Sequence, residues 1–190
     1  MSALEGVHPV RLPGQRVVVR EGDPRDLRAM HEYASDAAVT RFMTWAPNSS
    51  IEQTRAVLEG QIDDARKKPR EDYQLTIALV ATDELVGRIR MTITSRRHGL
   101  ADLGYVLRRS CWGHGYATEA VRLLVGFGFE VLGLHRLEAT CDPENVGSWR
   151  VLEKVGFQRE GRLRRNLLSH GNWRDSFVYG LLADEWRASP

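Results

Sequence analysis

The sequence GYVLRRSCWGHG (residues 104–115) runs directly into YATEAVRLLVGFGFEVL (residues 116–132), and together they predict a strand, a tight turn and a helix. The helix is amphipathic, because apolar residues recur near a 3.6-residue period. Gly113 and Gly115 lack a Cβ, so the turn can adopt positive φ and expose N–H groups at the helix N-terminus, which suits a phosphate. A turn without a ligand is the alternative. The predicted apolar stripe comprises Tyr116, Ala120, Leu124, Phe127 and Val131.

The residues after this turn distinguish between two nucleotide-binding motifs. A dinucleotide-binding fingerprint needs a small residue three positions after Gly115 and an acidic residue at the end of the next strand. Thr118 meets the first requirement poorly, and Asp142 lies too far along the chain for the second. A nucleotide-binding oxidoreductase therefore stays only as the less favoured alternative. A Walker P-loop is excluded, because no Gly-Lys-Ser/Thr comes after the turn.

Length and composition limit the remaining interpretations. The 190 residues, 42% of them hydrophobic, are enough for one domain with a sizeable core. We expect residues 1–14, which contain two glycines and two prolines, to form a flexible leader, and residues 15–190 to form a single domain. The net charge of +2, from 27 basic and 25 acidic side chains, is too small to indicate a nucleic-acid partner.

Cysteine usage and apolar runs indicate the compartment. Cys111 and Cys141 are too few for a disulfide framework and lack the spacing of a zinc site, so we expect free thiols and no bound metal. The first residues contain no apolar signal-peptide core, and no apolar run reaches the length of about 18 residues that a membrane span requires. We therefore expect a cytoplasmic protein with no membrane partner.

Strand and helix signals alternate along the whole chain. Asp23 followed by Pro24, and Ser50 at capping-box spacing from a glutamine, each predict the start of a helix. Asn145 predicts the start of another helix, which Gly156 ends. Apolar and alternating runs predict strands at residues 15–20, 73–81, 85–93, 101–107, 134–141, 158–167 and 173–182.

These elements predict an α/β (α+β) fold. The strands at 73–81, 85–93 and 101–107 are joined by short loops, so the N-terminal part of the sheet is expected to be antiparallel. The strand at 134–141 comes after a long helix, and such a crossover makes it parallel to the strand at 101–107. We expect a mixed sheet of six or seven strands, with a parallel pair at its centre and about four flanking helices.

Several longer stretches resemble a known enzyme family. RRSCWGHGYATEA (residues 108–120) and HRLEATCDPENVGSWRVLEKVGFQREG (residues 135–161) are similar to the acetyl-CoA-binding core of the GNAT N-acetyltransferases. VTRFMTWAP (residues 39–47) and GNWRDSFVYGLLADEW (residues 171–186) resemble, more narrowly, the branch of RimJ/RimL ribosomal-protein N-terminal acetyltransferases. The resemblance covers most of the chain from about residue 16.

The resemblance implies a GNAT fold, in which two central parallel strands part and acetyl-pantetheine lies between them. It also implies direct transfer of an acetyl group from acetyl-CoA to a primary amine in a ternary complex, with coenzyme A as product. The acceptor would be a protein N-terminal amine or a small-molecule amine, and the choice between a monomer and a homodimer is left open. A catalytically silent acyl-CoA sensor on the same fold is the second functional hypothesis.

Cofactor-binding residues are assigned by their position in this pattern. The Gly-x-Gly loop would bind the pyrophosphate through its backbone, and the resemblance implies that the preceding strand end binds the pantetheine amides. Arg108 and Arg109 either approach the phosphates or form a solvent-facing pair. Ser110 stands where the wider family has Arg or Gln, so phosphate binding would depend on backbone donors. The assigned residues are Tyr105, Val106, Leu107, Arg108, Trp112, Gly113, His114, Gly115, Tyr116, Ala117, Asn145 and Ser148.

Two residues are assigned to proton transfer. The resemblance implies that Ser148 protonates the departing thiolate, while Asn145 binds the pantetheine arm. An ordinary helix cap at Asn145 and a hydrogen bond from Ser148 back to its own helix are the alternatives. Glu138 is assigned as the base that accepts the proton of the amine, against the alternative of a surface carboxylate paired with Arg136. The resemblance further implies that residues 40–50 help to line the acceptor side of the cleft.

Overall fold

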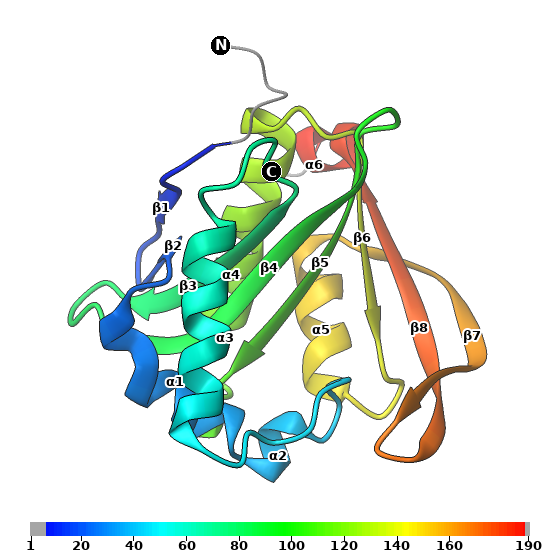
Figure 1. Ribbon diagram of the computed structural model, residues 1–190. Coiled ribbons are helices and arrows are strands. Elements are labelled where there is room, and N and C mark those ends of the chain that lie inside the picture. Colours follow the sequence, from blue (N-terminus) through cyan, green and yellow to red (C-terminus); the bar gives the residue numbers. More distant parts are fainter. Residues whose placement is uncertain (1–6, 189–190) are drawn as a thin grey trace.

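The sheet has eight strands in the order β1-β2-β3-β4-β5-β6-β8-β7, and β5 and β6 are its parallel neighbours (Figure 1). The computed structural model describes residues 7–188. The predicted mixed sheet, with an antiparallel N-terminal part and a parallel central pair, is confirmed. The strands are β1 (Arg11–Pro13), β2 (Val17–Glu21), β3 (Asp72–Leu79), β4 (Leu85–Ser95), β5 (Leu100–Leu107), β6 (Arg136–Cys141), β7 (Gln158–Ser169) and β8 (Asn172–Leu182).

Helices cover both faces of this sheet (Figure 1). Helices α1 and α3 pack on one face over the antiparallel strands and enclose a small apolar core, whereas α4 and α5 pack on the other face and enclose the main core. The four predicted helices correspond to α1, α3, α4 and α5, and α2 and α6 are short additions. The helices are α1 (Leu27–Ala34), α2 (Ala37–Thr40), α3 (Ile51–Asp64), α4 (Tyr116–Gly126), α5 (Val146–Val155) and α6 (Ala183–Ala188).

The additional strand comes from the segment predicted as a leader. Strand β1 pairs with β2, and the neighbouring Val10 is only 2% exposed, with its N–H donating to Glu21 Oε1 at 2.9 Å. The prediction of six or seven strands is therefore too low, and residues 11–13 are part of the sheet. The nearby prolines cannot donate to a ladder and make such a short edge strand hard to detect in a sequence. Residues 1–6 of the predicted leader lie outside the described residues.

Helix α4 begins where the Gly-x-Gly turn ends. Gly115 has a φ of 78°, in the left-handed region, and the helix starts at the next residue as predicted. Phe127–Val131 continues α4 as a π-helical turn, and Val131 is 53% exposed. The predicted apolar stripe is wrong at Val131, because a π turn departs from the 3.6-residue period. The buried residues of α4 are Ala117, Ala120, Val121, Leu124 and Val125.

Two of the predicted caps fix helix ends that lie far apart in the sequence. Ser50 Oγ accepts a hydrogen bond from Gln53 N–H at 3.2 Å and caps the start of α3. At the end of α5, Gly156 adopts a φ of 111°, and the N–H of Phe157 donates to Leu152 O at 3.0 Å. Gly156 therefore ends the helix as predicted, in a Schellman arrangement that packs Phe157 into the main core.

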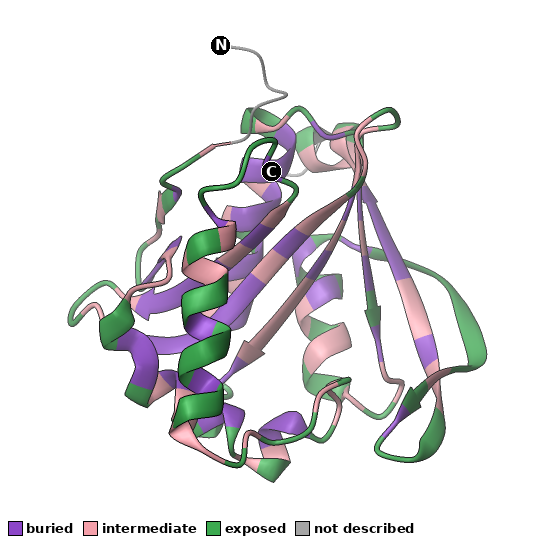
Figure 2. Ribbon diagram, viewed as in Figure 1, coloured by how far each residue is buried: buried purple, intermediate pink, exposed green. Residues whose placement is uncertain are grey.

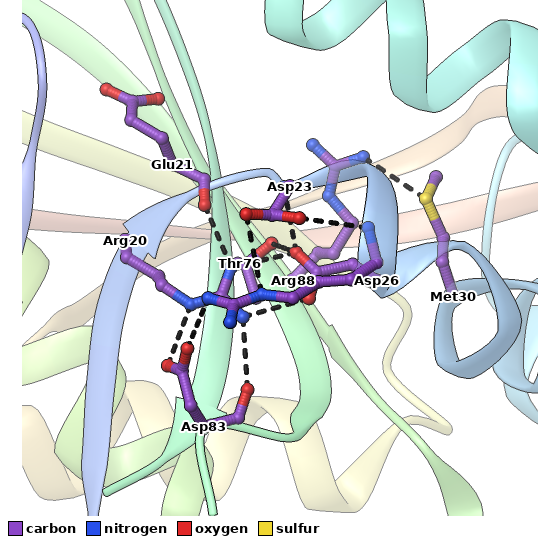
Figure 3. A network of polar contacts seen from close by, with 9 residues as sticks. Arg20, Glu21, Asp23, Asp26, Met30, Thr76, Asp83 and Arg88 are labelled. Atoms are coloured by element: carbon purple, nitrogen blue, oxygen red, sulfur yellow. Dashed lines mark hydrogen bonds and ion pairs between the residues drawn. The ribbon is translucent and has the colours of Figure 1, made fainter.

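A buried ion pair fixes the start of α1 (Figure 3). Two guanidinium nitrogens of Arg20 donate to the two carboxylate oxygens of Asp26 at 2.8 and 2.9 Å, and the two residues are 5% and 4% exposed. Asp83 accepts from Arg20 Nε at 3.0 Å, and Thr76 Oγ1 donates to Asp26 at 3.2 Å. Asp23 completes a capping box with Asp26, which confirms the predicted helix start. Loss of one partner from a buried ion pair strongly destabilises a protein, because the other charge stays buried and unpaired. We therefore infer that this network holds α1 on the sheet.

Burial is uneven across the sheet (Figure 2). Strands β2 to β4 are mostly buried, whereas the edge strand β7 is exposed along most of its length. Strand β8 pairs with β6 over the whole of β6, so the β7–β8 hairpin is attached to the sheet through β6. The hairpin therefore extends the sheet beyond the part that α1 and α3 cover.

We predict opposite effects of alanine at two glycines. A Cβ at Gly87 on β4 would lie 2.3 Å from Val106 O, so Gly87→Ala is expected to destabilise the protein by about 1–3 kcal/mol. A Cβ at Gly60 inside α3 would meet nothing within 4 Å, so Gly60→Ala is expected to stabilise the protein by about 0.5–1 kcal/mol. Urea denaturation monitored by circular dichroism measures both. Equal midpoints for Gly87→Ala and the unmodified protein would contradict this packing.

Candidate functional site

The loop before α4 presents its backbone to solvent. Gly113 and Gly115 have φ values of 80° and 78°, a conformation that L side chains rarely adopt. A Cβ at Gly113 would meet nothing within 4 Å, so the surface of the loop is open there. The first bond of α4 runs from Glu119 N–H to Gly115 O at 3.2 Å, and the N–H groups before it have no partner inside the helix. These donors suit an anion such as a pyrophosphate.

Four side chains of the loop differ in where they point. Trp112 is 48% exposed, and its indole N–H donates to Leu107 O at 3.0 Å. The rings of His114 and Tyr116 stack, with centroids 5.6 Å apart and planes inclined by 13°. Ala117 is buried in the main core. Trp112 and His114 therefore form the outer surface of the loop, whereas the half-buried Tyr116 packs against the main core and the buried Ala117 fixes the loop to it.

Arg16, the residue before β2, contacts this loop from the side, and the sequence did not indicate it. Its Nη1 donates to His114 O at 2.8 Å, its Nε donates to Glu119 at 2.9 Å, and its guanidinium lies 5.6 Å from the centre of the Tyr116 ring. Burial alone would raise the pKa of Glu119, but hydrogen bonds from Arg16 and from the N–H of Val17 hold it below its usual value. Glu119 is therefore a carboxylate at neutral pH and fixes Arg16 beside the loop.

Strands β5 and β6 part shortly after they begin. Their parallel register consists of three pairs, which end at Asp102 opposite Glu138. Strand β5 continues to Leu107 and β6 to Cys141 beyond the last of these pairs. The edge of β5 that faces β6 is therefore unpaired by β6 over its second half, as the resemblance implied.

Backbone direction shows which residues of β5 face this opening. Arg108 N–H donates to β4 at 2.9 Å, and Val106 O faces Gly87 on β4. Because backbone groups alternate sides along a strand, those of Tyr105 and Leu107 face the other way, toward β6. The backbone groups of Tyr105 and Leu107 thus face the opening, where the resemblance would place the pantetheine amides. The backbone of Val106 is turned toward β4, and its side chain packs against the small core.

The side chain of Tyr105 bridges the opening to α5. Its hydroxyl donates to Ser148 O at 2.8 Å and lies 3.1 Å from Ser148 Oγ. Burial raises the pKa of Tyr105, so the phenol stays protonated at neutral pH. Asn145 Oδ1 accepts from Ser148 N–H at 3.3 Å, which confirms the helix cap and leaves the amide NH2 of Asn145 available. The bridging role of Tyr105 was missed, because the residue was assigned for its backbone alone.

Glu138 lies on the other face of the sheet from α5, because its neighbours Leu137 and Ala139 belong to the main core. It accepts a hydrogen bond from Arg136 Nε at 2.9 Å and is 40% exposed, as in the surface-pair alternative.

Asp102 stands opposite Glu138 in the register, and the sequence did not indicate it. It accepts from Arg90 at 2.5 Å, and its side chain is 25% exposed. Burial raises the pKa of Asp102, and the nearby charge of Glu138 adds to this, against the opposing effect of Arg90. Two carboxylates thus meet at the point where β5 and β6 part.

Arg108 points to the α1 side of the loop. Its Nη1 lies 3.1 Å from Glu32 and 2.9 Å from Glu84, and its side chain is 14% exposed. Two carboxylates thus hold the Arg108 guanidinium, instead of the predicted phosphate. A cavity of about 480 Å3 opens at this end of β5, lined by Glu32, Tyr33, Asp36, Arg108, Arg109 and Ser110.

Cys111 and Cys141 are buried and unpaired, and burial, with the charges of Asp142 and Glu153, raises the pKa of the Cys141 thiol to about 12. Among residues 7–188, no group of three or more His, Cys, Asp or Glu side chains is arranged to hold a metal ion. Among the same residues, no helix combines the length and apolar character needed to cross a bilayer.

Comparison with known proteins identifies the family. Residues 16–158 match the model of the acetyltransferase (GNAT) domain. The uncharacterized N-acetyltransferase p20 of Bacillus licheniformis is 33% identical over 172 residues, which cover 90% of this chain and 96% of p20. The crystal structure of a GNAT-family acetyltransferase from Bacillus anthracis has a TM-score of 0.83 at 28% identity, covering 92% of this chain and 99% of that one. Mycobacterium smegmatis RimJ in complex with CoA-disulfide has a TM-score of 0.79 at 30% identity, covering 96% and 90%.

These findings confirm the GNAT fold and decide between the functional classes. The alternative of a nucleotide-binding oxidoreductase is wrong, because the matched family transfers acetyl groups. The Gly-x-Gly loop fits acetyl-CoA, the donor that this family uses, through its open backbone donors. The chain therefore belongs to the GNAT acetyltransferase family and is an acetyl-transferring enzyme.

Proposed function

We propose that the protein transfers an acetyl group from acetyl-CoA directly to a primary amine, in the manner of the RimJ/RimL branch. The acceptor is a protein N-terminal α-amine or a small-molecule amine. The observation that carries this proposal is the placement of Ser148 and Tyr105 beside the unpaired edge of β5, next to the open loop at 112–117. A silent acyl-CoA sensor would not need a hydroxyl pair at that position.

Acetyl-CoA would be held by groups of three kinds. The N–H groups of the loop would bind the pyrophosphate, with Arg16 adding a positive charge beside them. The backbone of Tyr105 and Leu107 faces the side on which the pantetheine amides would lie. The free amide NH2 of Asn145 would bind the same arm. When bound, acetyl-CoA supplies a thioester that is activated toward amines.

Ser148 is the proposed proton donor for the sulfur. Its Oγ lies at the N-terminal end of α5, and the neighbouring Tyr105 hydroxyl restricts its rotation. A thiol has an unperturbed pKa of about 8.5, so a single hydroxyl is a sufficient donor for a thiolate that is already a fair leaving group. Tyr105 positions Ser148, because its own proton is donated to Ser148 O.

Asp102 is the proposed base that accepts the proton of the amine, and Glu138 is the second candidate. Both carboxylates lie on the face of the sheet opposite α5, from which the amine would approach. Asp102 is the more buried of the two, and its raised pKa makes it the stronger proton acceptor. A mechanism through an acetylated cysteine would need a thiolate as the nucleophile. The Cys141 thiol has a pKa of about 12 and is therefore protonated at neutral pH, which favours direct transfer.

A thiol-release assay across amine classes tests the proposed function. The protein, acetyl-CoA and each of a peptide with a free N-terminus, an amino acid and spermidine are mixed, and released coenzyme A is measured with a chromogenic thiol reagent. Mass spectrometry of the acceptor checks that acetyl is transferred. Acetyl-CoA binding without turnover of any amine would favour the silent sensor.

We predict that Arg16→Gln weakens acetyl-CoA binding by about tenfold, because a charged group leaves the anion site. The turnover number at saturating acetyl-CoA is expected to change little, since Arg16 does not approach Ser148. Arg16→Lys keeps the charge and is expected to restore part of the affinity. Isothermal titration calorimetry measures the dissociation constant. An unchanged constant in folded Arg16→Gln contradicts the role of Arg16.

We predict that Ser148→Ala lowers kcat by about 10- to 100-fold while acetyl-CoA affinity stays close to its original value. Tyr105→Phe, which removes only the positioning hydroxyl, is expected to lower kcat less. Steady-state kinetics at saturating amine measure both variants. Full kcat in Ser148→Ala across the pH range would show that another donor protonates the sulfur.

We predict that Asp102→Asn lowers kcat/KM by about 100-fold and abolishes the acid limb of its pH profile. A carboxylate must be deprotonated to act as a base, so kcat/KM falls as the pH drops through the raised pKa of Asp102. Glu138→Gln is the matched variant and is expected to keep this limb. If Asp102→Asn keeps it and Glu138→Gln loses it, Glu138 is the base.

A further inference from the structure

A second cavity, of about 330 Å3, lies between α2 and the tip of the β7–β8 hairpin. The two segments are tied together across it. Ser169 Oγ donates to Met43 O at 2.9 Å, and His170 Nε2 lies 3.3 Å from Thr40 O. These hydrogen bonds fix the two segments that border the cavity relative to each other. Its lining residues are Ala37, Thr40, Arg41, Pro47, His170 and Arg174.

The charged side chains that line this cavity are basic. The guanidinium groups of Arg41 and Arg174 lie 4.9 and 5.6 Å from the centre of the same Phe42 ring, which holds the two cations close together. Arg41 pairs with Glu144 at 3.0 Å, and both side chains are more than half exposed, so this pair contributes little. Arg174 pairs with Asp142 at 2.5 Å and is 25% exposed.

Both arginines keep hydrogen-bonding capacity for a ligand. A guanidinium has five N–H donors in a planar fork that matches a carboxylate. One terminal nitrogen of Arg41 is directed to Glu144, and one of Arg174 to Asp142. The remaining donors can bind a carboxylate from a molecule in the cavity, whereas an ammonium group offers these N–H donors no acceptor.

Two arginines of the cavity contact the turn that leads to the proposed reaction centre. Asp142 and Glu144, which the two arginines contact, belong to the turn that leads into α5. Asn145 is the next residue in that turn, and Ser148 lies in the first turn of α5. A molecule with one group in the cavity can thus extend its other end toward the opening between β5 and β6.

We propose that this arginine pocket, defined by Arg41, Phe42, His170 and Arg174, binds a carboxylate of the acceptor. The enzyme then selects amines that also carry a carboxylate, and it selects against polyamines. The carboxylate belongs to an acidic side chain near a peptide N-terminus or to a free amino acid. This inference rests on the proposed function of amine acetylation.

Matched acceptors test the arginine pocket. The tripeptide amides Ala-Glu-Ala and Ala-Gln-Ala differ in one carboxylate, as do β-alanine and its amide, and spermidine is the cationic comparison. We expect kcat/KM to be at least tenfold higher for the carboxylate member of one pair, mainly through KM. The pair that responds identifies the source of the carboxylate. Equal values within both pairs, or a preference for spermidine, would overturn the proposal.

Variants assign the selectivity to the pocket. Arg41→Gln and Arg174→Gln are each expected to bring the ratio within the responding pair close to one. Arg97→Gln, at an exposed arginine in the turn between β4 and β5, is the matched control and is expected to keep the full ratio. An unchanged ratio in both pocket variants would place the selectivity elsewhere and overturn the proposal.

A binding measurement separates this inference from the proposed function. The acetylated peptides N-acetyl-Ala-Glu-Ala amide and N-acetyl-Ala-Gln-Ala amide, and N-acetyl-β-alanine and its amide, are titrated into the protein with coenzyme A, which requires no turnover. Tighter binding of one carboxylate member, by tenfold or more, supports the pocket even if no amine is acetylated. Equal affinities within both pairs in a turning-over enzyme would overturn the pocket and leave the acetyltransferase function intact.

Discussion

Strands β5 and β6 share three register pairs, and this short pairing determines how the centre of the molecule is built. Beyond Asp102 and Glu138, the backbone groups on the facing edge of β5 need partners from outside the sheet, because unpaired buried N–H and C=O groups are costly. The Tyr105 hydroxyl crosses the gap and donates to Ser148 O at 2.8 Å, which ties the start of α5 to β5. An extended ligand with amide groups can pair with the rest of that edge.

The parting of these strands also gives the site two sides with different chemistry. On the α5 side, hydroxyl and amide groups of Ser148 and Asn145 meet the Gly-x-Gly loop. On the opposite side, the carboxylates of Asp102 and Glu138 stand where the strands separate. In the proposed mechanism the thioester is held from the first side and the amine loses its proton on the second. The buried pair of Arg20 and Asp26 keeps α1 in place on this second side (Figure 3).

Features that depend on local backbone chemistry could be predicted from the sequence. Left-handed φ at Gly113 and Gly115 requires glycine, and Asn145 is a favoured cap, so the loop and both adjoining helices were predictable. Contacts between distant segments could not be predicted in this way. Arg16, for example, donates to His114 O, which lies 98 positions further along the chain. The raised pKa of Asp102 depends on burial in the folded sheet, which no local pattern records.

Backbone donors of the loop at 112–117 and of the edge of β5 hold acetyl-CoA in the proposed mechanism, and every later step depends on this binding. Hydrogen–deuterium exchange, measured by mass spectrometry with and without acetyl-CoA, reports on those N–H groups directly. Slower exchange is expected in peptides covering residues 103–107 and 112–117, and no change is expected in the exposed strand β7. If acetyl-CoA saturates the protein and neither segment exchanges more slowly, this mode of binding is contradicted.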